Sequence, residues 1–382
     1  MSLARLLAAA LLVAVASAVP AHARPGCGRG ATTTADWAAP GPHPVGHETI
    51  TLVDTSRRTP ANGSYPGASS RTLVTDVWWP TDRADPAPLV VVSHGYLDSR
   101  QGEAYLGQHL ASRGYVVAAP DFPLSHLGSP GGPTLNDIQN QPGDVSFVID
   151  QILQRTRTPG DPLQGHVDGR RIGATGLSLG GLTTLLVTYH RDLRDKRISA
   201  AMPIAPVGCF LTPRFFRTAR TPLLVMQGTT DLIVPFAENG QRAFDDSRRP
   251  HLLVALDGGS HTGFAGYLAA LPPTQHYDKS IGCSALLQGL GNQLADPNDT
   301  AFNALATRGA GVSTDAGRCP LPCAPDAVAA AQPGMSAARQ QEVARIAAAA
   351  FFDAWLADNR PARCFLWKTF AAENHDISVH GR

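Results

Sequence analysis

The chain has 382 residues, of which 43% are hydrophobic, and this is enough to bury the core of one large α/β domain. Its 32 Lys and Arg residues balance 31 Asp and Glu residues, so the net charge is only +1. The basic residues are scattered and form no run or stripe, which argues against nucleic acid or an anionic membrane as the partner. The composition leaves the oligomeric state open.

Residues 1–23 are predicted to be a secretory signal peptide. Arg5 supplies a positive charge ahead of an apolar run at 6–19, and Ala-His-Ala at 21–23 has the small-residue pattern of a cleavage site. The apolar run is short for a bilayer span, and an uncleaved anchor is the alternative. We therefore expect an exported chain, extracellular or periplasmic, with no stable membrane span after cleavage near Ala23.

The six cysteines all follow this predicted peptide, at positions 27, 209, 283, 319, 323 and 364. An even number in an exported chain favours disulfides, but the sequence does not choose among the pairings. Cys319 and Cys323 have the spacing of a zinc half-site, yet no second Cys or His pair with matching spacing follows them. The preferred prediction is a disulfide framework that braces the C-terminal third of the chain.

After an extended lead-in over residues 24–44, one α/β domain is predicted over residues 45–382. It opens with an antiparallel hairpin, because two segments rich in β-branched and aromatic residues flank a Gly/Ser/Pro-rich turn. Strands then alternate with helices, which predicts a doubly wound, mainly parallel sheet with ligands at the carboxyl ends of its strands. The hairpin strands are 48–56 and 72–79, the later strands 88–95, 115–120, 172–175, 198–205, 222–227 and, as the last, 252–256, and the helices 103–113, 145–157, from 179, and 335–358.

Residues 271–334 interrupt this alternation. They are rich in Pro, Gly, Asn and Asp, and they contain three of the six cysteines. We interpret them as an insertion that packs beside the site, or as an excursion braced by disulfides. The Ala-rich amphipathic helix at 335–358 is then expected to close the domain against the sheet.

The strand at 172–175 leads into Gly176-Leu177-Ser178-Leu179-Gly180, and an apolar helix follows. A serine on a sharp turn between a strand and a helix needs small neighbours, because the backbones crowd there. The pattern therefore predicts a nucleophile elbow with Ser178 as the attacking residue. An ordinary glycine-rich turn is the alternative, so a base, an acid and an oxyanion site are needed elsewhere in the chain.

Ser178 needs a base to take its proton and a carboxylate to orient that base. Asp231 follows the strand at 222–227, and His261 lies in a turn after the last predicted strand. They follow Ser178 in the chain order serine, acid, histidine. Asp257 is the rival acid, at the end of the strand that leads to His261. The rival histidines, at 126, 251, 276 and 375, lack this combination of strand-end context and chain order.

The segment Ser93-His94-Gly95-Tyr96 follows an earlier buried strand. Its glycine lets the backbone approach a substrate, so the N–H groups of Tyr96 and Leu179 are predicted to hold the oxyanion. One such donor stabilises a transition state by roughly 3 kcal/mol. His94 competes with His261 as the base, but its place ahead of the elbow favours a structural hydrogen-bonding role.

These segments resemble the α/β-hydrolase superfamily, and within it the dienelactone-hydrolase-like and platelet-activating-factor-acetylhydrolase-like secreted serine esterases. The resemblance covers residues 89–261 and resumes in the terminal helix. It implies an α/β-hydrolase fold with Ser178, Asp231 and His261 as the triad and Tyr96 and Leu179 as oxyanion donors. It is carried by Ser-His-Gly-Tyr at 93–96, Gly-Leu-Ser-Leu-Gly-Gly at 176–181, Gly-Thr-Thr-Asp at 228–231 and Gly-Ser-His-Thr-Gly-Phe at 259–264.

The chain also departs from these relatives. True dienelactone hydrolases use a cysteine nucleophile, whereas this chain has a serine. It is similar as well to secreted bacterial cutinases and polyester hydrolases, whose oxyanion loop likewise has Gly-Tyr. Those enzymes lack so long a segment after the histidine, and they usually carry His or Trp where this chain has Leu177. Residues 271–334 therefore leave the substrate open.

Together these residues predict a secreted serine hydrolase that cleaves small or polymeric carboxylic esters through an acyl-enzyme on Ser178. This chemistry requires no metal and no organic cofactor. A polyester hydrolase of the cutinase type, or a peptidase of the same fold, is the alternative. A non-catalytic exported binding protein is a less favoured one.

Overall fold

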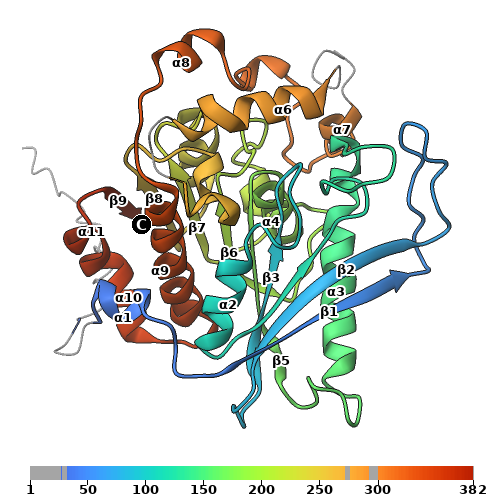
Figure 1. Ribbon diagram of the computed structural model, residues 1–382, viewed down its shortest axis with the longest axis vertical. Helices are drawn as coiled ribbons and strands as arrows, with labels where there is room; N and C mark the ends of the chain where they lie inside the picture. Colours follow the sequence, from blue (N-terminus) through green and yellow to red (C-terminus); the bar gives the residue numbers. More distant parts are fainter. Residues whose placement is uncertain (1–26, 28–31, 272–275, 292–299, 382) are drawn as a thin grey trace, which may run out of the picture.

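The computed structural model describes residue 27 and residues 32–271, 276–291 and 300–381. The predicted signal peptide, residues 1–23, lies outside the described residues. Within them one sheet has nine strands in the order β1-β2-β4-β3-β5-β6-β7-β8-β9 (Figure 1). The strands are β1 (Val45–Asp54), β2 (Arg71–Pro80), β3 (Ala87–Ser93), β4 (Val116–Pro120), β5 (Val167–Leu177), β6 (Ile198–Ile204), β7 (Leu223–Gly228), β8 (His251–Leu256) and β9 (Ile377–Gly381).

The pairing of the strands confirms the predicted doubly wound, mainly parallel sheet with an antiparallel opening hairpin. Strands β3 to β8 are joined by parallel ladders, whereas β1 with β2, β2 with β4, and β8 with β9 are antiparallel. Parallel strands are covered on both faces, which explains why β3 and β7 are mostly apolar and are buried throughout. Strand β1 instead alternates between exposed and more buried positions.

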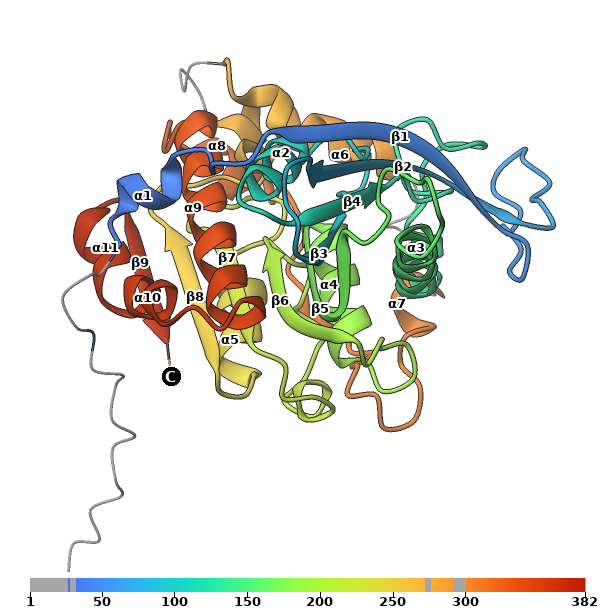
Figure 2. The same cartoon turned by 90° about the horizontal axis from the view of Figure 1, so that it is seen from below.

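Helices cover both faces of the sheet. On one face, Val90 and Val92 of β3 belong to the core that contains α2 (Ala104–Ser112) and α9 (Ala337–Leu356). On the other face, Leu89 and Val91 pack with α3 (Gln141–Arg155), while α4 (Leu179–Tyr189) and α5 (Arg242–Asp246) cover the later strands. Figure 2 shows β5 and β6 between α9 and α3. None of the helices in the described ranges has the length and hydropathy to cross a membrane.

The strand at 252–256 is not the last strand, contrary to the prediction from sequence. After α11 (Phe370–Glu373), β9 pairs antiparallel with β8 at the edge of the sheet. Only Ile377 of its five residues is buried. Such a short, half-exposed edge strand carries no alternating apolar pattern, so periodicity could not reveal it.

The lead-in is not extended throughout, because α1 (Thr34–Ala38) forms within it. The Thr33 hydroxyl accepts the N–H of Asp36, and the Asp36 carboxylate accepts the N–H of Thr33, which is a capping box. Trp37 is buried against Phe365, with ring centroids 5.8 Å apart. A helix this short depends on such contacts rather than on its own propensity, so the sequence pattern did not predict it.

All six cysteines form disulfides, in agreement with the predicted framework. Cys319 and Cys323 are each bonded to a different distant cysteine, so they do not form a zinc half-site. The pairs are Cys27–Cys364, with Cys364 in α10 (Arg360–Cys364), Cys209–Cys319 and Cys283–Cys323.

The insertion, meaning the described residues 276–291 and 300–334, lies together at one end of the molecule (orange in Figure 1). It contains α6 (Cys283–Leu290), α7 (Thr300–Asn303) and α8 (Pro325–Ala330). The disulfide Cys209–Cys319 joins it to the loop after β6, and Cys283–Cys323 closes it on itself. It therefore both packs beside the sheet and is braced by disulfides.

Candidate active site

Ser178 lies on a strained turn between β5 and α4. Its backbone has φ 58° and ψ −114°, a conformation that costs of order 1–3 kcal/mol in a residue other than glycine. The crowding explains the flanking glycines, because a Cβ on Gly176 or Gly180 would lie 2.4 Å or 2.0 Å from the carbonyl oxygen of Ser93. This is the geometry that the Gly-x-Ser-x-Gly pattern predicts.

The loop after β3 adjoins this turn. A Cβ added to Gly95 would lie 3.5 Å from the Cβ of Ser178, so the two loops are in van der Waals contact. Leu179 is the first residue of α4, where a backbone N–H has no partner within the helix. The Tyr96 hydroxyl lies 2.9 Å from the carbonyl oxygens of Pro133 and Gly289, which ties this loop to the insertion.

His94 holds the loop that carries Tyr96. Its Nε2 accepts the N–H of Phe122 at 3.0 Å, so the ring is neutral and its Nδ1 donates to the carbonyl oxygen of Gly95 at 2.7 Å. Burial lowers the pKa of His94 to about 4, which keeps it neutral at physiological pH. Both ring nitrogens are occupied by backbone groups, in keeping with the structural role that we predict for His94.

Asp231 and His261 form a buried pair. Asp231 Oδ2 lies 2.8 Å from His261 Nδ1. The other carboxylate oxygen, Oδ1, accepts the N–H groups of Val234 at 2.7 Å and Ile233 at 3.0 Å, and Gln227 Nε2 donates to Oδ2 at 3.0 Å. These donors fix the carboxylate, and the carboxylate in turn orients the imidazole.

The charges around His261 favour its protonation. Burial lowers the pKa of its imidazole, but the charge of Asp231, their hydrogen bond and the charge of Asp278 outweigh burial and raise the pKa above its ordinary value. Burial raises the pKa of Asp231, and the charge of His261 opposes that shift. An imidazole with a raised pKa is a stronger base toward a hydroxyl group.

The rival residues lie in other surroundings. Asp257 is exposed, and its backbone N–H donates to the carbonyl oxygen of Asp376. The rival histidines bind loop groups through one ring nitrogen or are exposed: His126 binds the Phe122 carbonyl oxygen, His251 the Ser247 hydroxyl and His276 the Thr230 carbonyl oxygen, while His375 is exposed.

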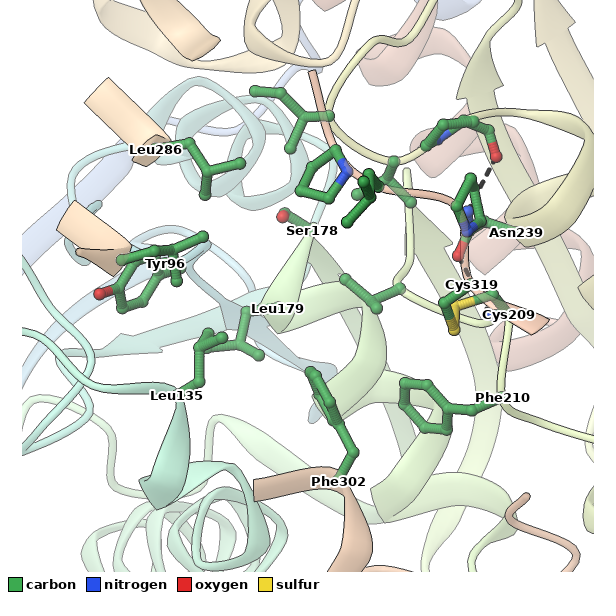
Figure 3. A pocket seen from close by; sticks show the side chains of 18 of the residues that line it. Tyr96, Leu135, Ser178, Leu179, Cys209, Phe210, Asn239, Leu286, Phe302 and Cys319 are labelled. Atoms are coloured by element: carbon green, nitrogen blue, oxygen red, sulfur yellow. Dashed lines mark hydrogen bonds between the residues drawn. A yellow bond between two sulfur atoms is a disulfide. The ribbon is translucent and has the colours of Figure 1, made fainter. Parts of the chain in front are cut away.

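Ser178 opens into an apolar cavity of about 350 Å³ (Figure 3). Tyr96 and Leu179 line this cavity with it, and so do Ile233 and Val234, the residues whose N–H groups hold Asp231. The structure therefore brings the elbow, the loop of Tyr96 and the loop of Asp231 to one cavity at the carboxyl ends of β3, β5 and β7.

A family model described as PETase, PET hydrolase-like, matches residues 67–267, just over half of the chain. This span contains the elbow and the loops of Tyr96, Asp231 and His261. The chain belongs to the PET hydrolase-like family. The predicted resemblance to secreted esterases of the α/β-hydrolase superfamily is confirmed.

Curated relatives agree with this assignment. A cutinase of Thermobifida fusca (strain YX) is 25% identical over 259 residues, which cover 66% of this chain and 74% of the relative. Cutinase cut1 of Thermobifida fusca is 26% identical over 260 residues, covering 66% and 70%. A bis(hydroxyethyl) terephthalate hydrolase of Streptomyces coelicolor is 26% identical over 166 residues, covering 43% and 47%. This member of the PET hydrolase-like family is accordingly a carboxylic ester hydrolase.

Sequence reasoning missed one buried carboxylate beside the pair. Asp278 begins a short helical turn, Asp278–Gly282, in the insertion, beyond the span that the PET hydrolase-like model matches. It is fully buried and accepts the N–H groups of Leu232, His261 and Thr262. A single Asp in a Pro- and Gly-rich segment has no periodic context, so no sequence signal could have assigned it.

Proposed function

We propose that this chain is a secreted serine esterase with Ser178 as the nucleophile, His261 as the base, Asp231 as the orienting acid, and the N–H groups of Tyr96 and Leu179 as oxyanion donors. The observation that carries this proposal is the strained elbow at Ser178 in one cavity with Ile233 and Val234, whose N–H groups hold Asp231 of the buried Asp231–His261 pair. A left-handed serine has a cost in folding, and such strain persists mainly where function requires it.

The reaction follows from this assignment. His261 takes the proton of the Ser178 hydroxyl while Oγ attacks the carbonyl carbon of the ester. The two backbone N–H groups stabilise the negative charge that develops on the carbonyl oxygen. The imidazolium then gives its proton to the alcohol oxygen as the C–O bond breaks, which leaves an acyl-enzyme. Water repeats the sequence, with His261 as base, and releases the acid together with free Ser178.

Export fits the same proposal. Three disulfides persist in an oxidising compartment and would be reduced in a bacterial cytosol. The pattern at residues 1–23 supplies the signal for export, with cleavage near Ala23.

A polyester is the second candidate substrate. The relatives described as cutinases and as a bis(hydroxyethyl) terephthalate hydrolase favour it. Small esters and polyesters would be cleaved by the same acyl-enzyme chemistry, so the choice between these two substrates depends on how the site binds the acyl group.

The nucleophile is tested with Ser178→Ala. We expect hydrolysis of p-nitrophenyl acetate to fall by about 10⁶-fold in kcat and labelling by a fluorophosphonate to disappear. Thermal unfolding measured alongside checks that the variant folds. A folded variant that keeps near-full activity would contradict the assignment. A wild-type chain that fails both to react with the fluorophosphonate and to cleave ester or amide substrates would indicate a non-catalytic protein.

A further inference from the structure

The cavity at Ser178 has two walls of different origin. The α/β body supplies Leu135, Val207 and Phe210, and the insertion supplies Leu286 and Leu290 of α6 and Phe302 of α7. Figure 3 shows Leu286 and Phe302 facing the space next to Ser178 from opposite sides. Among the described residues the lining is predominantly apolar, and the one carboxylate among them, that of Asp315, belongs to an exposed residue.

The insertion wall is fixed in place by several contacts. Phe302 packs on Phe210, with ring centroids 4.8 Å apart. The Tyr96 hydroxyl lies 2.9 Å from the Gly289 carbonyl oxygen, at the end of α6. The disulfide between Cys209 and Cys319 joins the two walls covalently. The insertion is therefore held against the α/β body and forms a fixed wall of the pocket.

We propose that the insertion makes this space an acyl-binding pocket, so that the chain acts on discrete esters of uncharged aromatic or medium-chain acids in preference to polyester surfaces. This rests on the proposed function, because the acyl group must enter beside Ser178. A polymer continues on both sides of the ester bond that is cleaved. A pocket with walls formed by Leu286, Leu290 and Phe302 instead suits an acyl chain that ends inside it. Apolar pockets of this size are typical of small-ligand sites.

The volume sets the size of the acyl group. A cavity of ~150 Å³ holds benzene, so about 350 Å³ accommodates an aromatic ring with substituents or an aliphatic chain of about ten carbons. Each methylene that moves from water into such a pocket is expected to raise kcat/KM by up to about 4-fold. The gain ends when the pocket is full.

The test is a series of p-nitrophenyl esters from acetate to palmitate, with the benzoate and polyethylene terephthalate film. We expect kcat/KM to rise to a maximum near eight to twelve carbons and to fall for palmitate, with little product from the film. A profile that falls steadily from acetate, or film hydrolysis that competes with the soluble esters, would overturn the proposal. Absence of hydrolysis of every ester would instead refute the proposed function.

Two neighbouring leucines give a matched pair of variants. Leu286 lines the pocket, whereas Leu287 is 51% exposed on the same helix. Leu286→Trp should lower the octanoate-to-acetate ratio of kcat/KM by at least about 10-fold, and Leu287→Trp should leave this ratio near that of the wild type. Equal ratios in both variants would contradict the proposal. Fluorophosphonate titration counts the folded sites, and Leu290→Ala, which enlarges the pocket, should move the maximum to longer chains.

A different observation carries a second inference. Asp278 Oδ2 accepts the N–H of Leu232 and the N–H of His261, both at 3.0 Å. Its Oδ1 accepts the N–H of Thr262 at 2.7 Å and also the Thr262 hydroxyl. One carboxylate thus binds the residue after Asp231 and the backbone of His261. The N–H of Cys323, also in the insertion, donates to the Leu232 carbonyl oxygen at 2.7 Å.

The geometry points to Asp278 as a positioning residue that sets the imidazole of His261 against Asp231. Among the described residues, the charges that act on His261 are those of Asp231, from the loop after β7, and Asp278, from the insertion, while His276 binds the loop of Asp231 at Thr230. Loss of the Asp278 charge should therefore act on the base itself as well as on the shape of the loops.

Asp278→Asn tests this role. The asparagine side chain accepts hydrogen bonds at its oxygen but not at its NH2 group, so it cannot replace both carboxylate oxygens of Asp278. We therefore expect kcat to fall by about 10- to 100-fold with a small change in KM. We also expect the acid limb of the kcat/KM profile to move to lower pH, because one negative charge beside His261 is lost. Asp326→Asn, an exposed site on α8, is the control and should change neither.

An unchanged kcat or an unmoved acid limb in folded Asp278→Asn would overturn the positioning role. If that variant fails to fold, Thr262→Val removes the hydroxyl partner and leaves the Asp278 charge. It should lower kcat while the acid limb stays in place. A wild-type kcat in Thr262→Val would then contradict the proposal.

Discussion

At the scale of single residues, the surroundings of each buried histidine decide whether its imidazole can take up a proton. His94 is buried, and both of its ring nitrogens are occupied by backbone groups, so it stays neutral. His261 is as deeply buried, but it faces the carboxylates of Asp231 and Asp278. The two histidines are equally plausible bases by residue type alone, and their neighbours give them different roles.

The raised pKa of His261 predicts the direction of the pH dependence. The base must be neutral to accept a proton, so activity is present above the pKa of the imidazole and is lost as the pH falls through it. We expect the acid limb of kcat/KM to have its midpoint above the ordinary value of about 6.5. A midpoint below that value in the wild-type chain would contradict this assignment.

Asp231→Asn provides the matched change at this scale. It should reduce kcat by about 10⁴-fold, because the orienting carboxylate is lost. Asp257→Asn, at the exposed rival acid, should stay close to wild type in the same assay of p-nitrophenyl ester hydrolysis. Comparable losses in the two variants would mean that the acid has been assigned to the wrong residue.

At the scale of elements, the elbow could be predicted because its signal is local. A strand, a tight turn and a helix fall within one stretch of sequence, and the need for glycines at 176 and 180 comes from contacts with the adjacent strand β3. The helices within the predicted insertion could not be found in this way. Its helices α6, α7 and α8 are too short to form by propensity alone, and contacts with the body and disulfides hold them in place.

The disulfide Cys283–Cys323 is therefore expected to support activity as well as stability. Replacing both cysteines by serine removes a cross-link between residues 40 positions apart, which costs roughly 4 kcal/mol in the chain-entropy account. The double variant should also have a reduced kcat at temperatures where the chain is still folded, because Cys323 and Asp278 both hold Leu232. Thermal unfolding and ester hydrolysis measure the two effects.

The disulfide Cys27–Cys364 is the control for this pair. It joins the lead-in to α10 rather than to the loops of Ser178, Asp231 and His261. The double serine variant should lower the melting temperature and leave kcat unchanged at temperatures where the chain is folded. If removal of the Cys283–Cys323 disulfide likewise lowers only the stability and leaves kcat unchanged, the insertion does not hold the loop of Asp231 in the way its contacts indicate.

At the scale of the whole molecule, the ends of the described chain are fastened to each other. The N–H of Thr34 donates to Glu373 at 2.7 Å, and Cys27 is bonded to Cys364. The C-terminal part in turn adds β9 to the sheet and places α9 against its face. Residues far outside the family match thus complete the core that supports the loops of Ser178, Asp231 and His261.

The sequence by itself determined the strand and helix alternation, the elbow at Ser178 and the chain order of Asp231 and His261, because each depends on local pattern or on the order of elements. The tertiary structure decided the hydrogen bond between Asp231 and His261, the disulfide pairs, β9, the wall of the pocket and the placement of Asp278. These depend on contacts between residues far apart in the chain, such as Asp278 with Leu232 and Phe302 with Phe210. Periodicity and motif spacing carry no information about such contacts, since only folding brings those residues together.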